Sequence, residues 1–371
     1  MKTRINSIDI VRGLIMIIMT LDHTRDFLHP GPSPTSMQTT TVLLFFTRWI
    51  THFCAPTFVF LAGVSTVLAG QRRTVAELRM FLLKRGLWLI ISDMLLIGFI
   101  FTFDPGYHTL IVEVLSVTGI GMILLALLLW APKPLIAAIG LIILVGHPYL
   151  PLPFLTNAIT IFPLGSKYQI FEFYPMLPWA SMVLLGYVFG QLYKTDYPAE
   201  KRRKTLIITG AIACVLFVAI RFMNNFGDPA PWAVQRNAAH TLLSFLNATK
   251  QAPSLLFFLM TLGPVMIFLA IAEKMKGRFA DICRVYGNVP YFYFIVHLSL
   301  IRAINILLIA FAGLPFKSDG NPLVWQAVNF VGIPLWAVYP LWLFVAALLY
   351  FPCKWFGEYK RSQAKWWLSY L

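Results

Sequence analysis

The chain has 371 residues, of which 58% are hydrophobic and 12% are charged, and its formal net charge at pH 7 is +15. Soluble domains carry about 45–50% apolar and about 25% charged residues, so this composition excludes a soluble enzyme, a disordered chain and a secreted disulfide scaffold. It predicts an all-α polytopic membrane protein. Lys and Arg mark the cytoplasmic loops of such proteins, so we interpret the positive charge as topology and expect no nucleic-acid partner.

The apolar runs predict about ten transmembrane helices in one domain that covers residues 1–371. A bilayer core of about 30 Å requires roughly 20 apolar residues per helix. The expected spans are 9–28, 41–69, 87–103, 111–130, 135–150, 174–193, 205–222, 254–272, 291–311 and 334–352. The second run is long and contains Arg48, His52 and Pro56, so we expect it to be kinked or partly outside the lipid. The first run has no small-residue cleavage site and is expected to remain in the mature protein.

The distribution of basic residues sets the expected orientation. With the N-terminus inside, most of the 30 Lys and Arg residues fall on inside segments, from Lys2 and Arg4 onwards, whereas few, such as Lys250 and Lys317, fall outside. Every inside segment then obeys the positive-inside rule, so both termini are expected in the cytoplasm. No organelle or retention signal is present, which favours the plasma (inner) membrane as the location.

Four arginines, Arg12, Arg25, Arg48 and Arg302, fall inside or at the edges of apolar runs. A charge at the bilayer centre costs from about 3 to more than 10 kcal/mol, so such residues face a protein interior or a wet cavity. We treat them as functional candidates. The four cysteines are dispersed and show no metal-ligand spacing, so we expect no metal.

The first span carries the densest set of candidates. Arg12 and His23 are eleven steps apart, which places them about 16 Å apart along a helix and, at nearly three turns, on one face. At the outer exit of the same span lie Asp22, Arg25 and His29. One face therefore presents a cation near the inner leaflet and an imidazole near the outer one. This arrangement suits a ligand that spans the membrane, anionic at its inner end and reactive at its outer end.

Further polar candidates lie on other spans. Arg48 and His52 are four residues apart and so share one helix face. Gly63 and Ser65 are small residues that let a helix or a ligand chain approach closely. Asn288 lies at the inner mouth of the ninth span. The remaining intramembrane polar residues are Asp93, Glu113 and His297.

Each candidate also has a simpler structural interpretation. Arg12 can snorkel to the inner edge of the bilayer. His29, which precedes a proline, can be an ordinary loop histidine, and His297 is interpreted as a buried, hydrogen-bonded helix histidine. Arg48 and His52 can join helices by polar packing. The clustering of charges and imidazoles at the ends of the first span is harder to explain by structure alone.

Several stretches resemble a known family. RINSIDIVRGLIMIIMTLDHTRDFLH, RWITHFCAPTFVFLAGVS, YPMLPWASMVLLGYVFG and YGNVPYFYFIVHL are similar to the bacterial branch of the heparan-alpha-glucosaminide N-acetyltransferase catalytic-domain family. That family belongs to a wider superfamily of transmembrane acyltransferases. The resemblance runs from Arg4 to about His297, and its opening motif is the most specific part.

The resemblance implies a ten-helix acyltransferase core that takes an acyl group from cytosolic acetyl-CoA and delivers it to an acceptor on the far side, often a sugar. The arginine-x10-histidine pattern of related membrane acyltransferases matches Arg12 and His23. In the lysosomal relatives an asparagine occupies the position of His23, and the catalytic histidine follows a few residues later. The nearest match to that later histidine is His29, although the intervening segment is shorter. The resemblance therefore leaves His23 and His29 open as the base.

The residue chemistry fits acyl transfer. A neutral histidine can take the proton of an amine or hydroxyl acceptor at physiological pH. Asp22 or Asp26 is expected to orient the imidazole, and Arg25 and Arg48 are candidate donors to the thioester oxyanion. Basic residues of an inner loop are candidate ligands of the CoA phosphates. Alternatively, they only mark this loop as cytoplasmic. These residues are Arg72, Arg73, Lys84 and Arg85.

The leading hypothesis is a membrane acetyltransferase that moves an acetyl group from acetyl-CoA, as cosubstrate, to an amine or hydroxyl of an exoplasmic sugar or glycan. Direct transfer is favoured over an acyl-enzyme. The alternative is a proton-coupled secondary transporter, for which buried His, Asp and Arg would form a relay, although the two halves show no matching broken helices. A non-catalytic scaffold explains the buried charges poorly. Membrane lipids are expected partners, and the sequence also allows a homodimer.

Overall fold

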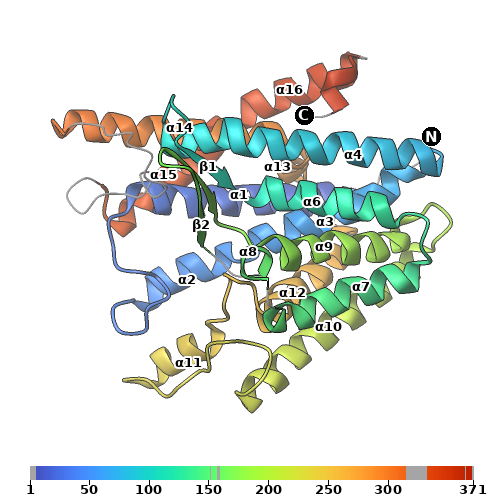
Figure 1. Ribbon diagram of the computed structural model, residues 1–371, viewed down its shortest axis with the longest axis horizontal. Helices are drawn as coiled ribbons and strands as arrows, with labels where there is room; N and C mark the ends of the chain where they lie inside the picture. Colours follow the sequence, from blue (N-terminus) through green and yellow to red (C-terminus); the bar gives the residue numbers. More distant parts are fainter. Residues whose placement is uncertain (1–5, 151, 157–158, 315–331, 364, 370–371) are drawn as a thin grey trace.

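The computed structural model describes residues 6–150, 152–156, 159–314, 332–363 and 365–369. The described chain is built of helices, most of which run along the long axis of the molecule, with one small sheet at one end (Figure 1). The expected all-α polytopic class is confirmed. Lys2, Arg4 and Lys317 lie outside the described residues.

The elements follow one another in a simple order. The helices are α1 (Asn6–Leu28), α2 (Val42–Thr51), α3 (Cys54–Gly70), α4 (Val75–Ser92), α5 (Gly98–Thr102), α6 (Val114–Leu128), α7 (Lys133–Gly146), α8 (Pro153–Thr156), α9 (Met176–Gly190), α10 (Ala199–Met223), α11 (Ala238–Leu246), α12 (Leu255–Ala272), α13 (Arg278–Gly287), α14 (Pro290–Phe311), α15 (Leu335–Leu348) and α16 (Tyr350–Ser362). The π-helix is η1 (Asp93–Ile97), and the 3-10 turns are η2 (His147–Tyr149), η3 (Gln191–Tyr193) and η4 (Trp366–Ser369). The strands are β1 (Thr109–Val112), β2 (Thr160–Leu164) and β3 (Tyr168–Glu172).

Each of the ten predicted spans overlaps a helix of the structure. Among the described residues, seven helical segments are long and apolar enough to cross a membrane: Val42–Gly70, Val75–Thr102, Met176–Tyr193, Ala199–Met223, Leu255–Ala272, Pro290–Phe311 and Leu335–Ser362. The apolar helices Val114–Leu128 and Lys133–Tyr149 are shorter. The remaining predicted span corresponds to α1, which is 23 residues long and carries charges at both ends. The count of ten crossings and the cytoplasmic termini stay predictions.

Two helix boundaries differ in instructive ways from a simple reading of the apolar runs. The second run is interrupted between Thr51 and Cys54, which is the kink expected near His52. The helix of the third predicted span, α4, begins at Val75 and not at residue 87. Thr74 and Glu77 form a reciprocal capping box at its N-terminus. Lys84 and Arg85, which the sequence assigns to an inner loop, therefore lie on helix α4.

Helix α1 lies at the centre of the bundle and packs against α2, α3, α12, α13, α14 and α15. Gly13 on α1 and Gly287 on α13 let the two backbones approach so closely that a Cβ atom at either position would collide with the other helix. On another side, the Trp342 indole donates a hydrogen bond of 2.6 Å to the Ile17 carbonyl oxygen. Small residues and interhelical hydrogen bonds thus fix α1 from several directions.

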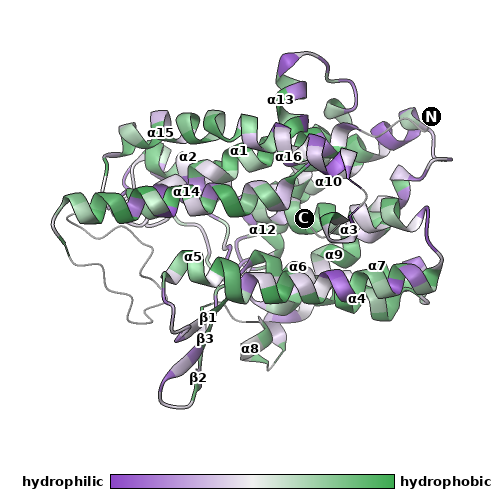
Figure 2. Ribbon diagram, turned by 90° about the horizontal axis from the view of Figure 1, so that it is seen from above, coloured by the Kyte–Doolittle hydropathy of each residue, from purple (hydrophilic) through white to green (hydrophobic). Residues whose placement is uncertain are grey.

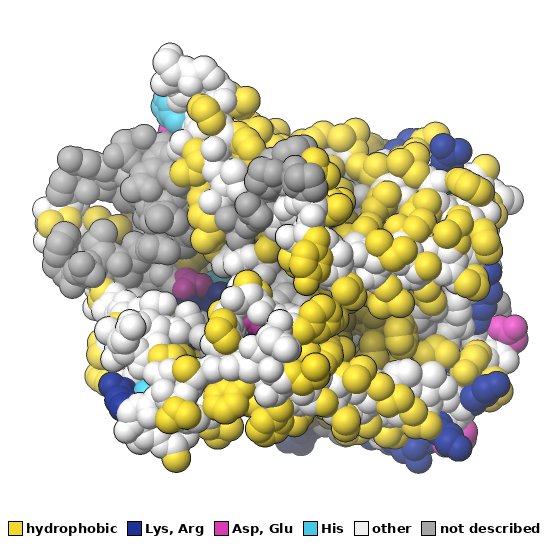
Figure 3. Space-filling view, turned by 60° about the horizontal axis from the view of Figure 1, so that its bottom comes forward, with side chains coloured by type: hydrophobic (Ala, Val, Ile, Leu, Met, Phe, Trp, Pro, Cys, Tyr) yellow, Lys and Arg dark blue, Asp and Glu magenta, His cyan; other side chains and the backbone are white. Residues whose placement is uncertain are grey.

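The two ends of the bundle differ in character. Lys and Arg side chains gather at the end where α4 and α10 begin, on the right of Figure 3, and hydrophobic side chains cover the middle. Hydrophilic residues, drawn in purple, are likewise frequent at the ends of the helices and in the hairpin of the sheet (Figure 2). The opposite end carries the sheet, in the order β1-β3-β2, with β1 parallel and β2 antiparallel to β3. We call these the basic end and the sheet end.

The buried carboxylate Asp93 joins the sheet end to the helices. It lies at the start of the π-helix η1, and its Oδ2 atom accepts hydrogen bonds from the Glu113 and Ser116 backbone amides at 2.8 and 2.9 Å. These amides belong to the first turn of α6 and would otherwise lack acceptors. Asp93 therefore serves as a cap of α6.

The contact between α3 and α9 gives a test of the packing. A Cβ atom at Gly186 would collide with the Phe60 carbonyl, whereas one at Gly146 would meet no atom within 4 Å. We expect Gly186→Ala to lower the free energy of unfolding by about 1–3 kcal/mol, since the backbones must move apart. Denaturant unfolding in detergent micelles measures the change. The control, Gly146→Ala, should stay close to the wild-type value, and equal effects of the two substitutions would contradict this packing.

Candidate active site

A cavity of about 350 Å³ opens between α1, α3, α4, α6 and α14. Three cations line it, namely Arg12 on α1, Arg85 on α4 and Lys360 on α16. Its walls further along α1 are apolar and include Met16, Met19 and Phe294. The cavity therefore combines a charged portion with a hydrophobic one, and α1 runs along both.

Arg12 is fixed at the charged portion by contacts across two helices. Its guanidinium donates hydrogen bonds to the Ser65 hydroxyl and, at 3.4 Å, to the Leu61 carbonyl oxygen, and it lies 3.6 Å from Asp9. Ser65 also lines the cavity, as do Arg85 and Asn288. The structure thus brings together four residues predicted to bind the cofactor. The guanidinium retains partial exposure, which a bound anion requires.

Gly63, also predicted to bind the cofactor, is placed elsewhere. A Cβ atom at this position would collide with the Val183 carbonyl and the neighbouring backbone of α9. Gly63 is not among the described residues that line the cavity. A small residue at this position can admit either a neighbouring helix or a ligand chain. The structure supports the first role, the close packing of α3 on α9.

A second, larger cleft of about 920 Å³ adjoins the charged portion at the basic end and shares Arg12 with it. Arg72, Arg73, Lys194 and Arg202 also line this cleft. Arg202 is held by Glu273, with an Nε to Oε1 distance of 2.5 Å. Lys84, predicted with this basic group, is not among the described lining residues of either space.

His23 lies one helical turn beyond Met19, toward the sheet end. Its ring centroid is 6.3 Å from that of Phe294, which itself lines the cavity. The Nδ1 atom of His23 is 2.7 Å from Nε2 of His297, and Nδ1 of His297 is 2.8 Å from the Tyr293 carbonyl oxygen. A two-histidine chain from α1 to α14 thus lies next to the apolar portion of the cavity.

An ion cluster surrounds the neighbouring Asp22. The Asp22 carboxylate accepts from Arg48 Nη1 at 2.6 Å, from Arg25 Nη2 at 3.0 Å and from the Thr51 hydroxyl at 2.8 Å. Arg25 also contacts Asp26 at 2.6 Å. Asp22 is therefore bound by Arg48, Arg25 and Thr51, and the printed contact to a ring nitrogen of His23 comes from His297. The role of Asp22 or Asp26 in orienting His23 stays a prediction.

His52 and Trp179 supply polar atoms without partners beside this cluster. Both side chains are buried, and neither Nδ1 of His52 nor Nε1 of Trp179 has a hydrogen-bond partner among the described residues. Their rings pack around Phe257, at centroid distances of 5.5 and 6.2 Å. Buried polar atoms are normally satisfied, so His52 and Trp179 each offer a hydrogen-bonding atom that the described residues leave unused. Arg48 belongs to the ion cluster around Asp22, and neither Arg48 nor His52 is among the described residues that line the cavity.

His29 is held in a different way from His23. It follows the last residue of α1, and its Nδ1 atom is 3.0 Å from the Ile333 carbonyl oxygen. It lies six positions beyond His23, which corresponds to about 9 Å along a helix. The structure therefore ties His29 to the segment before α15, whereas His23 lies against the cavity wall.

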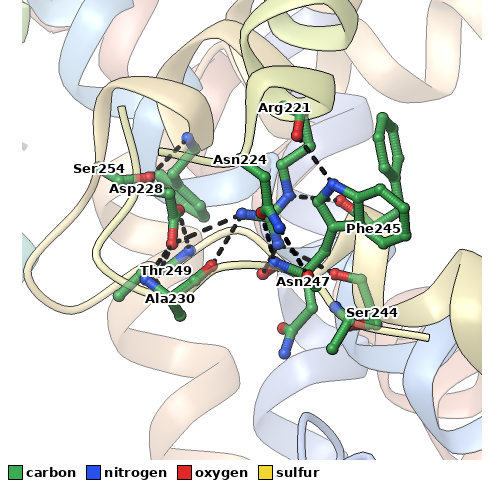
Figure 4. A network of polar contacts seen from close by, with 12 residues as sticks. Arg221, Asn224, Asp228, Ala230, Ser244, Phe245, Asn247, Thr249 and Ser254 are labelled. Carbon is green, nitrogen blue, oxygen red and sulfur yellow. Dashed lines mark hydrogen bonds and ion pairs between the residues drawn. The ribbon is translucent and has the colours of Figure 1, made fainter. Parts of the chain in front are cut away.

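The segment between α10 and α12 is folded tightly around two charged residues (Figure 4). Arg221 donates hydrogen bonds to the backbone carbonyl oxygens of Ala230, Ser244, Phe245 and Asn247. Asp228 accepts from Thr249 and Ser254. This network fixes both sides of Lys250, the residue that the segment presents to the site.

Lys250 and Glu113 are ionisable groups of the sheet end. The Lys250 ammonium lies 5.4 Å from the centroid of the Tyr174 ring. Burial, and then the charge of Arg48, lowers the pKa of Lys250 from 10.5 to about 8. Glu113, the N-cap residue of α6, is buried at the same end. Perturbed groups of this kind gather at functional sites.

Residues 4–220 match the family model described as Heparan-alpha-glucosaminide N-acetyltransferase, catalytic. The match covers more than half of the chain. The chain belongs to this family. The family expected from the sequence motifs is therefore confirmed, and by membership the chain is a membrane acetyltransferase. A search of curated proteins finds no matching relative.

Three residues of this acetyltransferase's candidate site were missed by sequence reasoning. From the sequence, His297 is a structural histidine, Lys250 is a charge on an outside segment, and Lys360 is one of the many basic residues assigned to the inside segments. All three follow the family match in the chain, and each reaches the site only through tertiary packing. The one available signal was the motif YGNVPYFYFIVHL, which ends shortly after His297.

The ion cluster predicts a strong effect of removing one partner. We expect Asp22→Ala to lower the free energy of unfolding of the acetyltransferase by about 3–5 kcal/mol, because two buried guanidinium groups lose the carboxylate that they share. Adding Arg48→Met should restore part of the loss. Denaturant unfolding of Asp22→Ala, Arg48→Met and the double variant measures this coupling. Glu200→Ala, which removes an exposed ion pair with Arg203, should cost less than about 1 kcal/mol. A double variant that loses the sum of the two single losses would refute the coupling.

Lys250 predicts a pH dependence of stability. Its pKa is about 8 in the folded protein and near 10.5 in an unfolded chain, so between these values the unfolded state binds the additional proton. The free-energy cost of burying the Lys250 ammonium on folding is therefore largest below pH 8, and it decreases as the pH rises toward 10.5. Lys250→Met should stabilise most near pH 7.5 and progressively less toward pH 9.5, as measured by unfolding at each pH. The exposed control Lys167→Met should show no such trend. A constant effect of Lys250→Met would contradict the lowered pKa.

Proposed function

We propose that this membrane acetyltransferase moves an acetyl group from cytosolic acetyl-CoA to an amine or hydroxyl of an exoplasmic sugar or glycan, with the plasma membrane as its location. The observation that carries the proposal is the cavity along α1. Cations line one portion of it, and its apolar portion extends to Met19, one helical turn before His23. A donor with an anionic head and a long, weakly polar arm matches this distribution.

The cationic residues suit the phosphates of CoA. Arg12, Arg85 and Lys360 line the cavity, and Arg72 and Arg73 line the adjoining cleft. Charge-assisted hydrogen bonds from guanidinium groups are well suited to phosphate oxygens. The apolar walls then favour the pantetheine arm, whose acetyl end would point toward His23. The basic end of the bundle is the expected cytoplasmic face, so the donor would enter from the cytosol.

His23 is proposed as the general base, and His29 is not preferred because of its distance from the cavity and its bond to Ile333. The acceptor nitrogen or oxygen forms a bond to the acetyl carbonyl carbon while His23 takes its proton. The carbon–sulfur bond then breaks, and the leaving CoA thiolate takes up that proton. Arg48, which lies within electrostatic range of His23, is a candidate to stabilise the developing oxyanion together with Arg25.

The acceptor would approach from the sheet end. His52, Trp179 and Lys250 offer hydrogen-bonding groups there, and aromatic rings such as that of Tyr174 offer a surface for a sugar ring. Site groups with free polar atoms select ligands that can satisfy them. A sugar carries both the hydroxyl or amine that reacts and the hydroxyls that would pair with this wall.

Binding and turnover test the proposal separately. Calorimetry with purified protein in detergent should show saturable acetyl-CoA binding, which Arg12→Ala weakens about 10- to 100-fold through loss of a charged hydrogen bond. His23→Ala should bind acetyl-CoA normally but release CoA about 10²- to 10⁴-fold more slowly with glucosamine as the probe acceptor. His29→Ala should act like wild type, as should Lys133→Ala at the start of α7.

The contrary results are equally clear. Absence of acetyl-CoA binding to folded wild-type protein would remove the donor half of the proposal and favour the transporter alternative. Loss of turnover in His29→Ala with normal turnover in His23→Ala would assign the base to His29.

A further inference from the structure

The two-histidine chain fixes where protons sit. His23 and His297 have nearly parallel ring planes, 16° apart, with centroids 5.0 Å apart and nitrogens only 2.7 Å apart. The short nitrogen contact identifies a hydrogen bond between ring edges. Because it joins Nδ1 of His23 to Nε2 of His297, one of these two atoms carries a proton and the other a lone pair.

The Tyr293 carbonyl decides which atom donates. It lies 2.8 Å from Nδ1 of His297, and a carbonyl oxygen can only accept a hydrogen bond. Nδ1 of His297 therefore carries a proton. In a neutral imidazole the other nitrogen has a lone pair, so Nε2 of His297 is the acceptor. It follows that Nδ1 of His23 donates, and that Nε2 of a neutral His23 is left with its lone pair.

A doubly protonated His297 is the one arrangement that would reverse this assignment. His297 is fully buried, and its neighbours in the described chain are the rings of His23, Tyr293 and Phe294. The Tyr293 hydroxyl is engaged by the Thr20 hydroxyl at 2.6 Å. These contacts supply no carboxylate to a buried imidazolium, which would be costly without one. The neutral form is therefore the one that fits.

We propose that His297 is the positioning residue of the acetyl transfer: it holds His23 as the Nδ1–H tautomer and so keeps Nε2 free to take the acceptor proton. This inference rests on the proposed role of His23. In serine proteases a carboxylate performs the corresponding task, and its loss leaves the base in the wrong tautomer. Here a neutral histidine, itself oriented by a helix carbonyl, fills that place.

Kinetics of matched variants test the proposal. His297→Leu removes the acceptor of the His23 proton and should lower kcat about 10²- to 10⁴-fold, with the KM for acetyl-CoA within about twofold of wild type. His297→Gln keeps an oxygen acceptor and an N–H donor and should restore kcat to within about tenfold of wild type. Ser299→Ala is the control, since the Ser299 side chain is exposed on the same helix, and it should leave kcat nearly unchanged.

A tautomer measurement gives a readout that does not depend on activity. Nitrogen-15 NMR of histidine-labelled protein in lipid bilayers distinguishes protonated from unprotonated ring nitrogens, and His23→Gln identifies the His23 signals by their loss. Wild type should show protonated Nδ1 and unprotonated Nε2 at His23. In His297→Leu the His23 signals should move toward the Nε2–H tautomer.

The outcomes separate the two proposals. A wild-type His23 in the Nε2–H form, or a folded His297→Leu variant with normal kcat, would overturn the positioning role while leaving the acetyl transfer intact. A wild-type protein that shows the expected tautomer but no acetyl transfer would overturn the proposed function and leave the assignment of the proton positions standing.

Discussion

Every charged side chain of α1 that lies inside the helix bundle needs a counter-charge or a hydrogen bond from a neighbour. The rest of the structure depends on this constraint. A charged helix at the centre of a membrane protein is stable only if its neighbours supply counter-charges and hydrogen bonds. At one end Arg12 meets Asp9 and Ser65, and at the other Asp22 is held by Arg25 and Arg48. The break between α2 and α3 lies just beyond Arg48 and Thr51, the two groups that reach Asp22 from α2.

The same contacts define the two halves of the proposed reaction. The partly exposed Arg12 faces a cavity with other cations, whereas the sheet-end cluster places fixed charges around His23. Between them α1 offers apolar side chains such as Met16 and Met19. In the proposed reaction, the anionic donor would bind at the cationic portion of the cavity and the polar acceptor at the sheet end, with the imidazole of His23 between them.

The sequence predicted the helical class, the approximate spans and the importance of the first helix, because hydropathy and helical periodicity are local properties. Of the residues that it proposed for cofactor binding, Arg12, Ser65, Arg85 and Asn288 line one cavity, whereas Arg48, His52 and Gly63 are not among the described residues that line it. It did not reveal the small sheet, the burial of Arg221 or the pairing of His23 with His297, which joins residues 274 positions apart. It offered Asp22 or Asp26 as the group that orients His23. Adjacent residues of a helix face different directions, and the Asp22 carboxylate is bound by Arg48 and Thr51 of α2.

Transfer across a sealed membrane tests the central claim most directly. Proteoliposomes with the basic end of the protein outward would receive acetyl-labelled acetyl-CoA outside and hold glucosamine inside. The account predicts labelled acetylglucosamine trapped in the lumen with wild-type protein and none with His23→Ala. Product that forms only when donor and acceptor share the same side, or no product from protein that binds acetyl-CoA, would contradict it.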